Sequence, residues 1–271
     1  MKIALTIAGS DPSAGAGVQA DLKTFAACGV YGLSIVTAIT AQNTVGVRSI
    51  FPVPAEIIVS QLDAVADDFE IHATKIGMLA TIDIVRAVRT GIERWSLPNV
   101  VLDPVMMATS GEVLLSREGV DLLRSDLVRL ATVVTPNAAE AAVLAGMSVV
   151  TAVDARLAAE RILALGPRAV IVKGGHLDEV SAIDVLLDDS GCHQLTGPRV
   201  KTNSTHGSGC TFAAAVAANL ALGRTVRHSA EEAKKYVAGA LQHGLSIGHG
   251  HGPFDHFWGL RGKGQRLETG G

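Results

Sequence analysis

The sequence predicts a doubly wound α/β sandwich, in which helices cover both faces of a mostly parallel central sheet. Short β-branched segments alternate with alanine-rich amphipathic segments along the chain, as expected for repeated strand–helix units. Runs within the expected strands, such as Val100–Leu102, are apolar throughout, a composition typical of strands that are covered on both faces. The chain has 271 residues, of which 48% are hydrophobic, which is enough for one large domain. We expect that domain to span residues 1–258 and a flexible, glycine-rich tail to span 259–271.

The individual elements follow from local composition and periodicity. Runs rich in β-branched residues predict strands at Ile3–Ala8, Ser34–Ala41, Ser49–Val53, Ala73–Ile76, Val100–Asp103, Val133–Thr135 and Ala169–Lys173. Amphipathic, alanine-rich runs predict helices at Gly17–Cys28, Ala55–Asp68, Ile82–Trp95, Arg117–Leu127, Ala138–Ala145, Ala155–Leu165, Ser208–Leu222 and Ser229–Ser246. Ala182–Leu187 and Cys192–Thr196 flank a polar turn, which predicts a small hairpin at one edge of the sheet.

Composition argues against several classes of partner. The formal net charge is −3 and the 23 basic residues are scattered, so we expect no nucleic-acid partner. Cys28, Cys192 and Cys210 are far apart and form no Cys-x-x-Cys pair, which favours a reducing compartment over a disulfide framework. Apolar runs are shorter than the roughly 20 residues that span a bilayer, and Met1–Gly9 resembles a buried strand more than a signal peptide. We therefore expect a cytoplasmic protein with no membrane partner.

The most informative segment runs from Thr205 to Thr211 and contains Gly207, Ser208, Gly209 and Cys210. Glycines and a serine at a helix start leave backbone N–H groups uncovered, and these groups together with the helix dipole can hold an anion. Tight packing explains the alanines that follow, but it does not explain two glycines around a serine. The segment is not a Walker loop, since Gly-x-x-x-x-Gly-Lys-Ser/Thr is absent. It predicts a phosphate or oxyanion site.

A second glycine cluster runs from Gly9 to Gly17, directly after the first expected strand. It is not a dinucleotide fingerprint, because the Gly15-x-Gly17 pair does not follow the strand directly and Ser34–Ala41 carries no acidic residue. Two interpretations remain, a flexible strand-to-helix turn and a close approach of the backbone to a small ligand.

Polar residues follow the ends of several expected strands. Asp103 and Lys173 each end an apolar strand, where they either reach solvent or serve a site, and the lysine can neutralise phosphate charge. Asn137 and Glu140 have the spacing of a capping box, but the carboxylate can also help to hold hydrated Mg²⁺ beside phosphates. Gln42 either caps a turn or presents its amide to the edge of a heterocycle.

Several strings together resemble the hydroxymethylpyrimidine kinase family, from Ile7 to about Phe257. Their order and joint presence are specific, although each is weak alone. They are Leu5–Ser13, Gly15–Phe25, Ala41–Thr44, Lys75–Leu79, Asp103–Met106, Thr135–Asn137, Lys173–His176, the cluster ending in Cys210, and His249–Pro253.

The resemblance implies a ribokinase-like three-layer fold and a homodimer. It also implies transfer from ATP, with Mg²⁺, to hydroxymethylpyrimidine and then to its monophosphate, in thiamine biosynthesis. Its motifs place Gly9, Asp21, Gln42 and Met78 in the pyrimidine pocket, Asp103, Asn137, Glu140 and Lys173 around ATP and Mg²⁺ (Asn137 and Glu140 through water), and Gly207, Ser208, Gly209 and Cys210 in an anion hole.

Three positions are notable within this resemblance. Ser208 replaces an expected threonine, and Thr40 stands where an aliphatic residue is expected. Cys210 occupies the place of an aspartate base in most ribokinase-like enzymes. At a helix N-terminus we expect its pKa to be lowered, so that a thiolate accepts the substrate's proton. A pyridoxal kinase subgroup shares this cysteine and is the alternative assignment, and a non-catalytic ligand-binding regulator is another.

Overall fold

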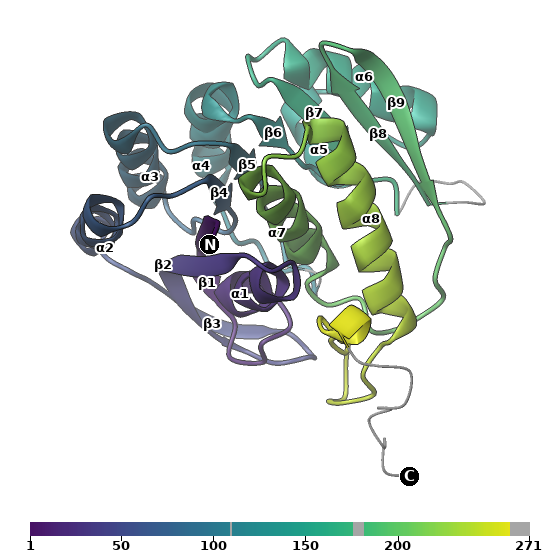
Figure 1. The fold of residues 1–271 in the computed structure, drawn as a ribbon, viewed down its shortest axis with the longest axis horizontal. Helices are drawn as coiled ribbons and strands as arrows, with labels where there is room; N and C mark the ends of the chain where they lie inside the picture. The colour runs from purple at the N-terminus through teal and green to yellow at the C-terminus, as the bar shows by residue number, and fades with distance from the viewer. Residues whose placement is uncertain (109, 176–181, 261–271) are drawn as a thin grey trace.

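The computed structural model describes residues 1–108, 110–175 and 182–260 (Figure 1). Its centre is a nine-stranded sheet in the order β3-β2-β1-β4-β5-β6-β7-β8-β9. The strands are β1 (Ile3–Ser10), β2 (Tyr31–Gln42), β3 (Val47–Pro52), β4 (Ala73–Ile76), β5 (Val100–Leu102), β6 (Val133–Val134), β7 (Ala169–Val172), β8 (Ala182–Asp188) and β9 (Gly191–Gly197). Residues 261–271, most of the tail predicted from the sequence, lie outside the described residues.

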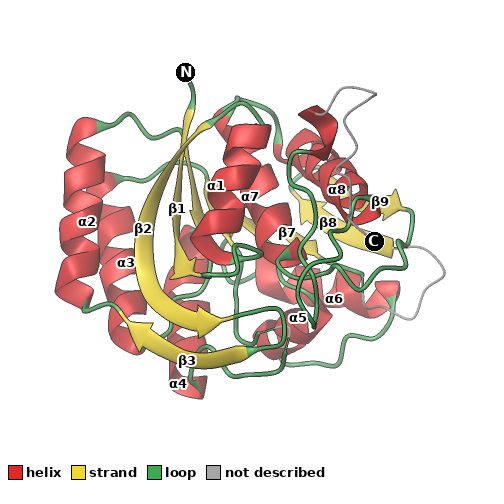
Figure 2. Ribbon diagram, turned by 90° about the horizontal axis from the view of Figure 1, so that it is seen from below, coloured by secondary structure: helices red, strands yellow, loops and turns green. Residues whose placement is uncertain are grey.

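The sheet is parallel in its centre and antiparallel at both edges. β2, β1, β4, β5, β6 and β7 pair in parallel, whereas β3 and the β8–β9 hairpin pair antiparallel. Figure 2 shows that β2 bends strongly and that β3 runs beside its second half. The predicted α/β fold, with its mostly parallel sheet and edge hairpin, is confirmed.

Helices cover both faces of the sheet (Figure 1). They are α1 (Gly17–Ala27), α2 (Ala55–Asp68), α3 (Ile82–Trp95), α4 (Arg117–Leu122), α5 (Ala138–Ala145), α6 (Ala152–Leu163), α7 (Ser208–Ala221) and α8 (Val226–Gln242). Leu5 and Ile7 of β1 belong to one hydrophobic cluster, which also contains buried residues of helices α2 to α6. Ala4 belongs to a second hydrophobic cluster, which contains buried residues of α1, α7 and α8. This alternation is expected, because neighbouring residues of a strand point to opposite faces.

Several boundaries differ from the sequence-based prediction, among them those of α6, α4 and α8. Helix α6 begins at Ala152, because Thr151 and Asp154 form a capping box there. The α-helix expected over 117–127 ends at Leu122, and Leu123–Leu127 form a short π-helix instead. Helix α8 ends at Gln242 rather than at residue 246, because the chain turns and Gly244 pairs with Phe254. Over the described ranges, no helix is both long enough and apolar enough to cross a membrane.

Candidate active site

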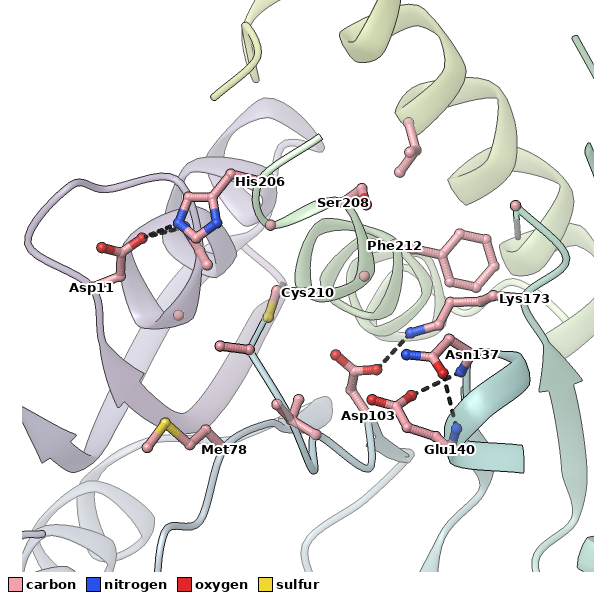
Figure 3. A pocket seen from close by; sticks show the side chains of 18 of the residues that line it. Asp11, Met78, Asp103, Asn137, Glu140, Lys173, His206, Ser208, Cys210 and Phe212 are labelled. Carbon is pink, nitrogen blue, oxygen red and sulfur yellow. Dashed lines mark hydrogen bonds and ion pairs between the residues drawn. The ribbon is translucent and has the colours of Figure 1, made fainter. Parts of the chain in front are cut away.

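A cavity of about 310 Å³ opens beyond the carboxyl ends of the parallel strands, beside the start of α7 (Figure 3). Ligand sites of open α/β sheets lie at this edge, and the volume is in the range of small-molecule pockets. Eleven of the twelve site residues expected from the sequence line it: Gly9, Gln42, Met78, Asp103, Asn137, Glu140, Lys173, Gly207, Ser208, Gly209 and Cys210. Residues far apart in the chain therefore meet at one place.

The two glycine clusters form one wall of this cavity, backbone against backbone. Gly207 has a φ of +80°, and a Cβ on it would lie 1.9 Å from the carbonyl oxygen of Gly15. A Cβ on Gly15 would lie 2.2 Å from Cδ2 of His206. No side chain fits at these two positions without displacing the backbone or the histidine. The close approach of the two segments explains why both are rich in glycine.

The start of α7 carries the chemistry expected of an anion site. Gly207 is the N-cap of this helix, and a glycine has no side chain to cover the first N–H groups. A Cβ on Gly209 would lie 3.1 Å from Nζ of Lys173 and 3.9 Å from Oδ2 of Asp103. The helix start therefore faces a lysine, and both its partial positive charge and the ammonium group favour a bound anion.

Opposite α7, Lys173 pairs with Asp103, and Glu140 lies nearby in a capping box. Nζ of Lys173 lies 2.8 Å from Oδ1 of Asp103. The N–H of Asn137 donates to Oε2 of Glu140 at 2.8 Å, and the N–H of Glu140 donates to Oδ1 of Asn137 at 2.9 Å, so the predicted capping box is formed. Glu140 also lines the cavity, so its capping role does not preclude a role in the site.

The charge balance of this cluster is visible in the pKa of Glu140. Burial raises that pKa to about 7; Lys173 opposes the shift, and the charge of Asp103 adds to it. Burial disfavours the charged form of Lys173, but Asp103 and Glu140 outweigh it and raise the lysine's pKa. With all three groups ionised, one negative charge is uncompensated, so the cluster attracts a further cation or a proton.

Cys210 lies on the cavity wall, but its thiol is not activated. Burial raises the pKa of Cys210 to about 11; Lys75 opposes the shift, whereas Asp103 and Asp21 add to it. The expected lowering of this pKa is therefore wrong. The loss of hydration on burial, the largest effect, outweighs the lowering of this pKa by Lys75.

Asp21 does not line the cavity, contrary to the prediction. Helix α1 turns this residue toward the sheet with Val18 and Phe25. Its carboxylate is fully buried, 2.7 Å from Nζ of Lys75, and accepts the hydroxyl proton of Thr6 at 2.6 Å. Asp21 is therefore a buried structural partner beneath the site.

Two residues with no role assigned from the sequence complete the end of the cavity near Gln42. His206 and Asp11 are both buried lining residues, and Nε2 of His206 lies 2.8 Å from Oδ2 of Asp11. Burial alone would raise the pKa of Asp11, but hydrogen bonds from His206, Ser13 and Ala16 outweigh it and lower that pKa. The sequence signal that could have indicated His206 is its position directly before Gly207, at the start of the glycine cluster.

The opposite end of the cavity also holds an ion pair that the sequence did not reveal. Nζ of Lys234 lies 2.8 Å from Oδ2 of Asp184, and Oδ1 of this carboxylate accepts the N–H of Gly174 at 2.8 Å. Lys234 and Asp184 line the cavity, together with Pro198 and Leu241. An acidic residue within the otherwise apolar segment of β8 was a possible sign of this pair.

Sequence comparison places these features in a known family. The sequence model of phosphomethylpyrimidine kinase matches residues 11–255. The hydroxymethylpyrimidine/phosphomethylpyrimidine kinase of Escherichia coli is 47% identical over 257 residues, covering 94% of this chain and 97% of that protein. The thiamine biosynthetic bifunctional enzyme TH1 of Arabidopsis thaliana is 45% identical over 95% of this chain, which spans 50% of that longer protein.

Solved structures agree with the sequence relatives. Pyridoxal kinase from Bacillus subtilis, solved as an ADP complex, has a TM-score of 0.88 and 40% identity over 94% of this chain and 97% of its own. Phosphomethylpyrimidine kinase from Clostridium difficile has a TM-score of 0.79 and 39% identity over 88% and 98% of the two chains. With matches of this identity over nearly its whole length, the chain belongs to the phosphomethylpyrimidine kinase family.

Proposed function

We propose that this enzyme transfers a phosphoryl group from ATP to the hydroxymethyl oxygen of 4-amino-5-hydroxymethyl-2-methylpyrimidine. A second transfer to the monophosphate gives the diphosphate that thiamine biosynthesis uses. The observation that carries the proposal is the shared cavity, in which the glycine start of α7 faces Lys173 and Asp103 while Gln42 lies at the other end. The names of the relatives and the ADP bound by the Bacillus subtilis neighbour support the same reaction.

The end of the cavity near Gln42 suits the pyrimidine ring. An amide offers both a donor and an acceptor to the edge of a heterocycle. A Cβ on Gly9 would lie 3.1 Å from Sδ of Met78, so glycine at this position leaves room for the thioether beside the ring. Thioethers pack well against aromatic rings. We assign ring recognition to Gln42, Gly9 and Met78.

The start of α7 and the Lys173 cluster suit the phosphates of ATP and a hydrated Mg²⁺. Backbone N–H groups of residues 207–210 and the ammonium of Lys173 neutralise phosphate charge. The structure's described residues contain no cluster of three or more His, Cys, Asp or Glu side chains that forms a protein cage for a metal. Mg²⁺ usually keeps several waters and uses one or two carboxylates together with phosphates. Asp103, Glu140 and Asn137 fit that role, and the ion would supply charge neutralisation.

Cys210 contributes by position rather than by basicity. In phosphoryl transfer the protein mainly positions the groups and stabilises charge, because the transition state is loose in most analyses. A neutral thiol beside the anion site can orient the accepting hydroxyl. The pre-formed thiolate base expected from the sequence is not part of this mechanism.

The test is a two-substrate assay of ATP consumption with product analysis by mass spectrometry. Hydroxymethylpyrimidine should yield both mono- and diphosphate, with a kcat/KM above that for pyridoxal. Pyridoxal kinase is the second candidate, because the Bacillus subtilis neighbour has that name at 40% identity, and a higher kcat/KM for pyridoxal would establish it. Absence of diphosphate would contradict the two-step reaction, and no turnover of either compound would indicate a ligand-binding regulator.

We further propose that residues 1–258 act as one domain and that the protein is a cytoplasmic homodimer. Ile39 of β2 and Phe51 of β3 are paired neighbours in the sheet, and they are 54% and 63% exposed. Exposed apolar neighbours of this kind suit a contact between two copies. Light scattering should give twice the chain mass of 28.0 kDa, and Phe51→Lys should shift the mass toward that of one chain.

A further inference from the structure

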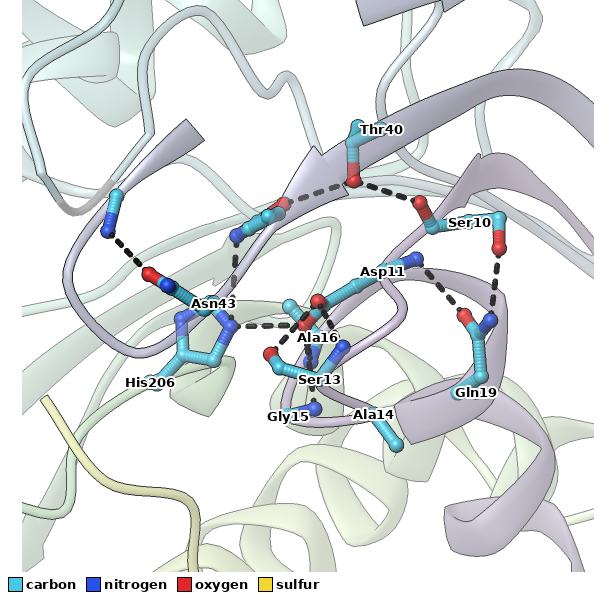
Figure 4. A network of polar contacts seen from close by, with 12 residues as sticks. Ser10, Asp11, Ser13, Ala14, Gly15, Ala16, Gln19, Thr40, Asn43 and His206 are labelled. Atoms are coloured by element: carbon cyan, nitrogen blue, oxygen red, sulfur yellow. Dashed lines mark hydrogen bonds and ion pairs between the residues drawn. The ribbon is translucent and has the colours of Figure 1, made fainter. Parts of the chain in front are cut away.

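The amide of Gln42 lies between two buried polar side chains. They are Thr40 and His206, both labelled in Figure 4. Oγ1 of Thr40 is 2.9 Å from the carbonyl oxygen of Ser10 and 3.2 Å from Oε1 of Gln42. Nε2 of His206 is 2.8 Å from Oδ2 of Asp11 and 3.5 Å from Nε2 of Gln42. A turn of 180° about the last side-chain bond exchanges the oxygen and nitrogen of an amide, so the neighbours decide its orientation.

The histidine side of this network favours an amide oxygen. Asp11 accepts hydrogen bonds from Ser13 and from the backbone N–H groups of Gly15 and Ala16. Those from Ser13 and Ala16 help to lower its pKa. An ionised carboxylate only accepts, so Nε2 of His206 carries the proton that points to Asp11. With its proton directed to Asp11, Nε2 of His206 has no lone pair for an amide N–H, so the partial positive charge of this ring edge favours the oxygen of Gln42 over its nitrogen.

The threonine side requires the amide nitrogen, for an independent reason. A hydroxyl has one proton, and a carbonyl oxygen only accepts. The proton of Thr40 therefore goes to Ser10, the nearer of its two partners at 2.9 Å. Oγ1 of Thr40 then offers only lone pairs to Gln42, so the amide atom at 3.2 Å must be a donor.

Both sides lead to one orientation. We infer that Thr40 and His206 hold the amide of Gln42 with its nitrogen toward Thr40 and its oxygen toward His206, and that Thr40 is thereby a specificity-determining residue for the substrate ring. The first half of this inference depends only on the free protein, whereas the second half rests on the proposed function.

A fixed amide distinguishes between rings. After its hydrogen bond to Thr40, Gln42 retains one N–H and its oxygen, which match a ring nitrogen beside an amino group. The aminopyrimidine carries that amino donor next to its hydroxymethyl group. Pyridoxal carries a carbonyl acceptor at the equivalent place, which would face the amide oxygen. An aliphatic residue at position 40 would leave only the 3.5 Å contact with His206, and the amide could then turn to suit pyridoxal.

The ligand arm of the test compares Thr40→Val with the wild type by calorimetry. We expect pyrimidine affinity to fall about 5–10-fold and the preference for pyrimidine over pyridoxal to fall about tenfold, as for loss of a buried hydrogen bond. Thr40→Ser keeps the hydroxyl and should restore the preference. Thr24→Val is the matched control, because its buried hydroxyl also donates to a backbone carbonyl, that of Ala20 at 2.7 Å, outside the cavity lining. An unchanged preference in Thr40→Val would overturn the specificity role.

The orientation arm uses the free, full-length protein and NMR. The side-chain amide protons of Gln42 should show nuclear Overhauser contacts with the methyl group of Thr40. Contacts with the ring protons of His206 instead would overturn the inferred orientation. This arm needs no substrate, so it separates the two claims. Failure of the enzyme to bind or phosphorylate the pyrimidine, together with amide contacts to Thr40, would reject the proposed function and leave the orientation standing.

Discussion

Lys75→Met should destabilise the protein strongly, because it leaves a buried carboxylate without its counter-ion. Lys75 and Asp21 are both fully buried, and their charged atoms lie 2.7 Å apart. Burial disfavours the lysine's charge, but Asp21 and Asp103 outweigh it and raise the pKa of Lys75. The remaining contact of Asp21 would be the hydroxyl of Thr6, since Oδ1 has no partner within the described residues. Breaking such a pair by removing one partner costs about 3–5 kcal/mol.

Urea unfolding followed by circular dichroism measures this loss. The double variant Asp21→Asn/Lys75→Met buries no charge and should recover most of the stability. Arg227→Met is the control, because the Arg227–Glu231 pair is largely exposed and should contribute less than about 1 kcal/mol. The reasoning fails if Lys75→Met costs no more than this control, or if the double variant loses the sum of both single changes. Since Asp21 lies outside the cavity lining, the affinity of Asp21→Asn for the pyrimidine should equal that of the wild type.

Three further predictions follow from the site. The pKa of Glu140 is raised from 4.5 to about 7, so the stability that its protonated form provides is present below pH 4.5 and is lost as the pH rises through 7. Glu140→Gln keeps a capping oxygen and should be more stable than wild type at pH 8, by up to about 3 kcal/mol. Its activity should be lower and its Mg²⁺ dependence weaker. An equal difference in stability between variant and wild type at pH 4 and at pH 8 would contradict this prediction. At pH 7.5 iodoacetamide should label the exposed Cys192 before Cys210, whose pKa is about 11, and peptide mass spectrometry showing the reverse order would reveal an activated thiol. Gln42→Ala should weaken pyrimidine binding by about 1–3 kcal/mol without affecting ATP binding, and unchanged pyrimidine affinity by calorimetry would remove Gln42 from the pocket.

The sequence by itself determined the order of strands and helices, because each depends on residues near one another in the chain. Apolar runs such as Val100–Leu102 became buried parallel strands, and the Asn137–Glu140 spacing became a capping box. Local composition also indicated the proposed anion site, since Gly207 and Gly209 lie at the start of α7. Where a boundary depended on a distant partner, as with Gly244 and Phe254 at the end of α8, the sequence-based prediction extended too far.

Only the tertiary structure decided the charge states and partners within the site. The N-terminal position of Cys210 suggested a low pKa, but burial and the carboxylates of Asp103 and Asp21 raised it. Asp21 belongs to a motif of the family, yet the direction of its side chain depends on which face of α1 meets the sheet. His206 and Asp11 are 195 residues apart and meet only because two glycine clusters pack together. Hydration and Coulomb energies depend on distances in space, so a linear pattern of residues can suggest such groups but cannot assign their protonation or their partners.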